Sequence, residues 1–107
     1  MTHQELDARS LAIHRLVAQK IRCDPTLLRI ANANLARWRT RATPNDLHYL
    51  GEWDRILEGG LDAALAVATE DSERASALRQ SSPFAGILTP SERIAFLKTW
   101  RVASEAH

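Results

Sequence analysis

The histidines and the single cysteine are the residues of this chain that could bind a metal ion or act as nucleophile and base. The four histidines are His3, His14, His48 and His107, and none belongs to an H-E-x-x-H or a paired E-x-x-H pattern. His48 and Glu52 are four residues apart and could supply two metal ligands, but no third ligand is evident. We interpret them as a surface pair, and no metal or other cofactor is expected.

The remaining groups with catalytic potential also lack partners. Cys23 lies between Arg22 and Asp24, without the neighbouring base that would activate a thiol. The acidic run 70–73 holds three carboxylates that point in different directions around a helix. The G-x-S-x-G pattern of serine hydrolases and glycine-rich phosphate loops are absent from the sequence. The sequence therefore predicts that the protein is not an enzyme.

A basic run with an aromatic residue inside it, Arg37-Trp38-Arg39-Thr40-Arg41, raises the possibility of nucleic-acid binding. The candidate phosphate-binding residues are Arg29, Arg37, Arg39 and Arg41. Trp38 falls on the apolar side of its predicted helix, which favours the core over a stacking platform. The isoelectric point of about 8.0 is also low for a DNA-binding domain. A small nucleic-acid-binding regulator is therefore the alternative interpretation.

The segment 80–91 contains no charged residue, although 25% of the chain is charged. Its two prolines stiffen it, and its apolar side chains could bind a protein partner at low entropic cost. The candidate partner-binding residues are Arg79, Ser81, Ser82, Phe84, Ile87, Leu88 and Arg93. The competing interpretation is a buried connector, in which Phe84, Ile87 and Leu88 pack under the last helix as a hydrophobic staple. Whether the segment is buried or exposed stays open at this point.

Capping residues predict where the helices that position these groups begin and end. Asp24-Pro25, Thr43-Pro44 and Thr89-Pro90 each place a capping side chain before a proline, which is typical of a helix start. Glu92 completes a capping box with Thr89. Gly59-Gly60 predicts a helix end.

Apolar residues recur with helical period in five segments, at 6–21, 27–38, 49–57, about 61–80 and 94–100. The fourth segment carries mostly small residues on its apolar side, and we expect one long helix there. The last segment has a broad apolar side made by Ile94, Phe96, Leu97 and Trp100. The prediction is an all-α, single-domain antiparallel bundle of about five helices that covers residues 1–107.

Composition and charge agree with this class. The chain of 107 residues is 45% hydrophobic and has a net charge of +1. Residues 1–41 are basic and residues 42–80 are acidic, and we expect these opposite charges to offset each other within the fold. A single cysteine, no membrane-length apolar run and no signal-peptide pattern predict a cytoplasmic location.

The runs EDSERASALRQSSPFAGILTPSER and LDARSLAIHRLVAQKI resemble a group of short bacterial proteins associated with the antitoxin halves of toxin–antitoxin pairs. The resemblance covers most of the chain. It implies a cytoplasmic protein that binds a co-expressed toxin and blocks it sterically, without chemistry of its own. The chain departs from the common antitoxin plan because no separate DNA-binding module is evident.

Overall fold

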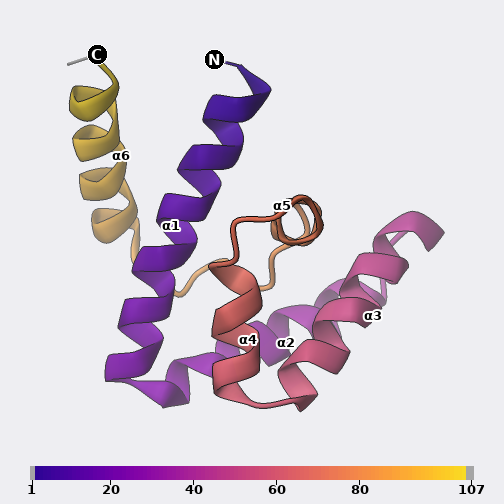
Figure 1. Ribbon diagram of the computed structural model, residues 1–107. Coiled ribbons are helices and arrows are strands. Elements are labelled where there is room, and N and C mark those ends of the chain that lie inside the picture. Colours follow the sequence, from indigo (N-terminus) through magenta and orange to yellow (C-terminus); the bar gives the residue numbers. More distant parts are fainter. Residues whose placement is uncertain (1, 106–107) are drawn as a thin grey trace.

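The computed structural model describes residues 2–105, and within them the chain forms α-helices and no strand. The elements are α1 (His3–Cys23), a short 3-10 helix η1 (Pro25–Leu27), α2 (Leu28–Arg39), α3 (Pro44–Glu58), α4 (Leu61–Ala68), α5 (Glu73–Arg79) and α6 (Pro90–Glu105) (Figure 1). The all-α prediction is confirmed, with six α-helices in the described residues where about five were expected. None of these helices is long and apolar enough to cross a membrane.

The capping residues begin helices where the sequence predicted. The Thr43 hydroxyl accepts a hydrogen bond from the Asp46 amide at 3.3 Å, and α3 follows. Thr89 and Glu92 form the expected capping box at the start of α6, with bonds of 2.8 and 3.2 Å. Asp24 caps η1 rather than a full α-helix, so that α2 begins three residues later than Pro25. Gly60 ends the α3 region with a φ of 103°, a conformation that glycine adopts without strain.

The expected long helix at 61–80 is wrong, because the chain breaks between Ala68 and Glu73 into α4 and α5. The Thr69 hydroxyl donates to the Leu65 carbonyl at 2.7 Å, at the last turn of α4. Ser72 caps the new helix by accepting from the Ala75 amide at 3.1 Å. Polar side chains that bond to nearby backbone groups compete with the continuing helix here, and the helical period of the small residues conceals the break.

The core lies where α1 packs against α4 and α5, and where α3 packs against α2, α4 and α5. Trp53 of α3 is fully buried there, and its indole N–H donates to the Leu78 carbonyl at 2.7 Å. The other largest fully buried side chains are Ile21, Leu35, Leu65, Leu78, Pro83 and Ile87. Two ion pairs join the basic first part of the chain to the acidic middle: Arg22 with Asp62, and Arg39 with Asp54. The expected meeting of opposite charges is confirmed at these two places.

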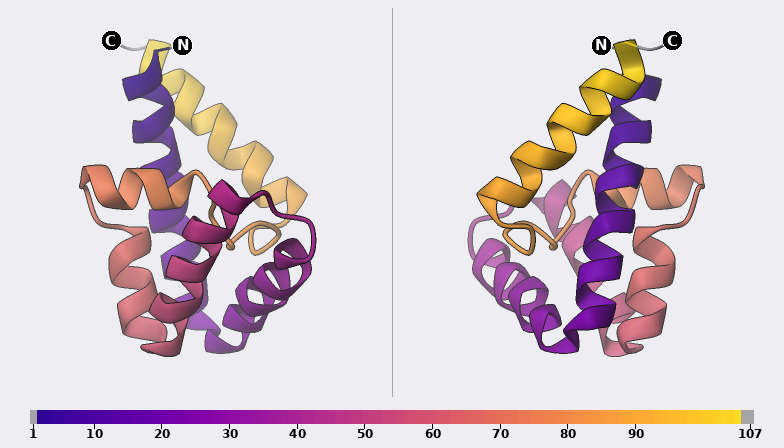
Figure 2. Two further views of the ribbon diagram at one scale, coloured as in Figure 1. Left: turned by 90° about the vertical axis from the view of Figure 1, so that its right-hand side faces the viewer. Right: turned by 90° about the vertical axis from the view of Figure 1, so that its left-hand side faces the viewer.

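Helix α6 stands apart from this core. Its chain direction is roughly opposite to that of α1, and its axis lies at an angle to that helix (Figure 2). No residue between 90 and 101 is buried, and Ile94 is 54% exposed. The apolar side of α6 predicted from the sequence is therefore present but only partly covered by the rest of the chain.

Candidate functional site

The segment that joins α5 to α6 is a buried connector. Phe84 and Ile87 are 4% and 1% exposed and belong to the main core cluster, so their predicted role as exposed anchors is wrong. The Phe84 ring packs edge-on against Trp53, at 5.4 Å between centroids, and against His14 at 5.9 Å. The connector interpretation was right about burial, but these side chains enter the core of α1–α5 instead of forming a staple under α6. Leu88 is half-buried against the same core.

Side chains from α1 and α2 hold the backbone of this connector. The buried amide of Asn34 donates to the carbonyls of Pro83 and Ala85, both at 2.8 Å. The Lys20 ammonium donates to the Ile87 carbonyl at 2.7 Å. A buried carbonyl needs such a partner, because leaving it unpaired costs free energy. Asn34 and Lys20 were missed by the sequence analysis, although a polar Asn34 beside Ala31 and Leu35 on an apolar helix face was a readable signal.

His14 and Ser82 form the most defined polar contact of the site. The imidazole of His14 is buried, with Nδ1 2.7 Å from the Ser10 carbonyl and Nε2 2.7 Å from the Ser82 hydroxyl. A carbonyl can only accept, so Nδ1 carries the proton and the Ser82 hydroxyl donates to Nε2. Burial lowers the pKa of His14; the Ser10 hydrogen bond opposes this and the charge of Arg79 adds to it. The imidazole is therefore held neutral.

This arrangement places a hydroxyl on a histidine nitrogen that could accept its proton, as nucleophilic catalysis requires. The bond between Ser82 and Nε2 also fixes the connector to α1, and the bond from Nδ1 to Ser10, within α1, orients the imidazole ring. Ser82 Oγ additionally accepts from the Phe84 amide at 3.3 Å, so the hydroxyl is held from two sides. His14, like Asn34, was a polar residue on an apolar helix face, and that was the signal available in the sequence.

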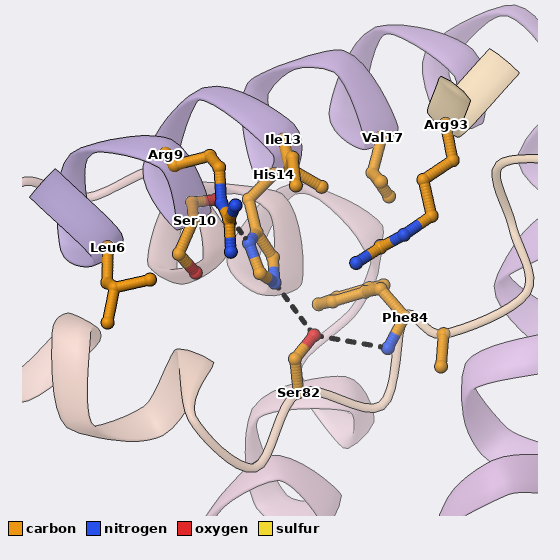
Figure 3. Close-up of a pocket in the computed structure, with 10 residues that line it drawn as sticks. Leu6, Arg9, Ser10, Ile13, His14, Val17, Ser82, Phe84 and Arg93 are labelled. Carbon is orange, nitrogen blue, oxygen red and sulfur yellow. Dashed lines mark hydrogen bonds between the residues drawn. The ribbon is translucent and has the colours of Figure 1, made fainter. Parts of the chain in front are cut away.

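A pocket of about 270 Å³ opens beside this contact, between α1, the connector and the start of α6 (Figure 3). It is lined by Leu6, Arg9, Ser10, Ile13, His14, Val17, Ser82, Phe84, Ala85 and Arg93. Arg93 of α6 and Arg9 of α1 extend into it from different helices. Of the predicted partner-binding residues, the fold brings only Ser82, Phe84 and Arg93 together here.

Arg79 was predicted to contact a partner protein, but it does not lie on an accessible surface. It is 5% exposed, and its guanidinium donates to the Glu70 carbonyl at 2.7 Å and, at 3.4 Å, to that of Ala68. These carbonyls lie at the C-terminal end of α4, where a cation is favoured by the helix dipole. Arg79 Nε is buried and has no hydrogen-bond partner among the described residues. The predicted contact with a partner is corrected to a clamp across the break between α4 and α5.

Ser81, the other predicted contact residue, is half-buried on a different side of the connector. It lines a second pocket of about 290 Å³ together with Trp38, Arg41 and Leu50. Trp38 is half-buried against the core, in agreement with its predicted core position.

The four candidate phosphate-binding arginines are all exposed but do not act as one group. Arg39 pairs with Asp54 of α3 at 2.9 Å. Arg37 donates to the Asn34 side-chain oxygen at 2.6 Å and so supports the connector. Arg29 and Arg41 form no ion pair with the described side chains.

The side chains that were considered as metal ligands do not form a cluster among the described residues. The described residues include no cluster of three or more His, Cys, Asp or Glu side chains that could hold a metal ion. Glu52 is hydrogen-bonded to Arg55 at 2.5 Å and to Arg74 at 3.3 Å, and these cations lower its pKa. Cys23 is exposed at the end of α1.

The connector, the His14–Ser82 contact and the half-covered α6 are thus the features from which a function must be argued. Comparison with known proteins adds no further constraint, since no family model, no curated protein and no solved structure matches the chain.

Proposed function

We propose that this protein is a non-enzymatic protein-binding module, and that it acts as an antitoxin that binds a co-expressed toxin and blocks it sterically. The observation that carries the proposal is the incompletely covered apolar side of α6. When a partner removes the exposed apolar side chains of a helix from water, the free energy of the system decreases, which favours binding. The resemblance of the sequence to antitoxins supports this class of partner.

The proposed docking surface, called the α6 surface below, consists of Ile94, Phe96, Leu97 and Trp100. Ile94 is 54% exposed, and the other three are half-buried. Phe96 and Trp100 stack with their centroids 6.2 Å apart. Aromatic side chains of this kind contribute most of the binding free energy in many interfaces. The α6 surface replaces the buried Phe84 and Ile87 as the apolar part of the interface.

Charge around the α6 surface favours an acidic partner. Arg93, Lys98 and Arg101 are exposed on α6, and the acidic Glu92 is already paired with Lys20 at 2.6 Å. A second copy of the chain would bring the same cations against each other, which disfavours self-association through this helix. An acidic surface on a different protein would complement it and increase the rate of association.

The His14–Ser82 contact is assigned a structural role in this proposal. The hydroxyl is held by His14 Nε2 and by the Phe84 amide, and both bonds position Phe84 for the core. Blocking a toxin by occlusion requires this rigid support and no catalytic step.

Co-purification tests the proposal. The chain is expressed with the product of its neighbouring gene, and the pair Ile94→Asp with Trp100→Ala is compared with Ala95→Glu, which alters the opposite side of α6. We expect the double variant to lose the partner and its neutralising effect on growth, and the control to keep both. Full neutralisation by a folded double variant would contradict the proposed surface.

Nucleic-acid binding is the second candidate, and the exposure of Arg29 and Arg41 favours it. It predicts a mobility shift of duplex DNA at low salt that weakens steeply as salt is added. Arg29→Gln with Arg41→Gln would abolish this shift, and its absence at low salt would remove the candidate.

A further inference from the structure

The pocket between α1 and α6 has the size of a site for a small molecule. Its volume is about 270 Å³. Ligand pockets usually begin near about 300 Å³, so this one suits a compact ligand of roughly ten heavy atoms.

The pocket combines apolar walls with two cations. Leu6, Ile13, Val17 and Phe84 provide apolar surface, and Arg9 and Arg93 provide guanidinium groups (Figure 3). The residues that line it include no carboxylate. Neither arginine forms a hydrogen bond or an ion pair with the described side chains around it. Two like charges directed at one cavity repel each other, and a bound anion would offset this repulsion.

The remaining polar groups of the pocket do not supply the missing negative charge. The Ser82 hydroxyl donates to His14 Nε2, and His14 Nδ1 donates to the Ser10 carbonyl, so both neutral groups are occupied within the protein. The pocket therefore offers an uncompensated pair of planar donors, which match the two oxygens of a carboxylate.

We propose that this pocket binds a small carboxylate that carries an apolar group, such as an arylalkyl acid. The guanidiniums of Arg9 and Arg93 bind the carboxylate, and the apolar group packs among Ile13, Val17 and Phe84. A bare anion leaves the apolar walls in contact with water, and a neutral apolar molecule leaves the two cations unpaired. The site is a property of the α1–α6 junction and does not depend on the proposed partner protein.

Calorimetric titration of the full chain with 3-phenylpropionate tests the proposal, with 3-phenylpropionamide and acetate as reference ligands. We expect 3-phenylpropionate to bind with a dissociation constant of about 1 mM, given the usual efficiency of ligands of this size. The amide lacks the charge and acetate lacks the apolar group, so each is expected to bind at least about tenfold more weakly. Nuclear magnetic resonance should show the His14 ring signals shifting on addition of the acid.

Variants locate the site. Arg9→Gln combined with Arg93→Gln is expected to weaken 3-phenylpropionate binding by about tenfold or more, because both charge-assisted contacts are lost. Arg15→Gln removes an exposed arginine of the same helix outside the pocket and is expected to leave binding unchanged. Equal binding of acid and amide, unchanged binding by the folded double variant, or no saturable binding would each overturn the proposal.

Discussion

At the scale of single residues, three polar side chains determine how the connector sits. His14, Lys20 and Asn34 each bond to the segment 82–87 from helices that are far away in sequence. The separation is 68 residues for His14 with Ser82 and 49 for Asn34 with Pro83. Each of these residues makes a specific contact that is buried or partly buried, so each is expected to affect stability more than its surface neighbours do.

The neutral state of His14 makes the stability of the fold dependent on pH. Burial lowers the pKa of His14 from its ordinary value of 6.5. As the pH falls below this value, the unfolded chain takes up a proton that the folded protein resists, so the unfolded state binds more protons and the free energy of unfolding decreases. The decrease continues until the pH reaches the lowered pKa of the folded protein. Above pH 6.5 this contribution is constant.

Urea unfolding of the natural protein and of His14→Gln, measured between about pH 7.5 and pH 5, checks this expectation. The natural protein should lose more of its free energy of unfolding over this range than the variant. The other histidines are common to both proteins and cancel in the comparison. Parallel pH profiles for the two proteins would show that His14 is not the group responsible.

Asn34→Ala is expected to destabilise the protein by about 2–3 kcal/mol, because the buried Pro83 carbonyl, the partly buried Ala85 carbonyl and the Arg37 guanidinium lose their partner. Asn32→Ala, on the exposed side of the same helix, is the matched control and should change stability by less than about 0.5 kcal/mol. Denaturant titration measures both. A loss for Asn34→Ala as small as that of the control would mean that the connector does not need this amide.

At the scale of elements, the sequence predicted the hydrogen bonds between neighbouring residues that begin a helix, but not the contacts between residues distant in the chain. Thr43 and Thr89 predicted the starts of α3 and α6 because a cap acts on the three residues that follow it. The break at 69–72 was missed because the small residues keep their helical period across it, while Ser72 and Arg79 decide the outcome through the backbone. The burial of Phe84 could not be predicted, since it depends on side chains of α1 and α3 that only the fold brings near.

The start of α6 is fixed to the rest of the protein mainly through Lys20. Its ammonium contacts the Ile87 carbonyl at 2.7 Å and the Glu92 carboxylate at 2.6 Å. The hydrogen bond from Lys20, followed by that from the Thr89 amide, lowers the pKa of Glu92 to about 2. The contribution of this carboxylate to stability is therefore present above its ordinary pKa of 4.5 and is lost as the pH falls through about 2.

Lys20→Met is expected to loosen α6 while leaving α1–α5 folded. Backbone amides of residues 93–101 should exchange with solvent about tenfold faster or more. The helix keeps its capping box but loses the Lys20 ammonium that bonds to Ile87 and Glu92. Gln19→Met changes the exposed neighbour and serves as control. Unchanged exchange of α6 in Lys20→Met would show that the apolar contacts of the helix hold it without this lysine.

At the scale of the whole molecule, the chain divides its apolar residues between folding and an uncovered surface. The connector contributes Phe84 and Ile87 to the core, and α6 contributes no buried residue between 90 and 101. The core should therefore not need α6, whereas it should need the connector. This division separates the requirement for folding from the proposed requirement for binding.

Two truncations test the division. Removing residues 90–107 leaves Phe84, Ile87 and their partners in place, so we expect a cooperative unfolding transition to remain and the partner protein to be lost. Removing residues 81–107 also deletes both buried side chains, each worth about 2–5 kcal/mol in a core, which together approach the whole stability of a typical domain. Circular dichroism and thermal melting are expected to show that this shorter chain is unfolded.

If the first truncation also fails to fold, then α6 belongs to the core and its apolar side is not free for a partner. If it folds and still binds the partner, the docking surface lies on α1–α5, where the exposed arginines of α2 become the next residues to test.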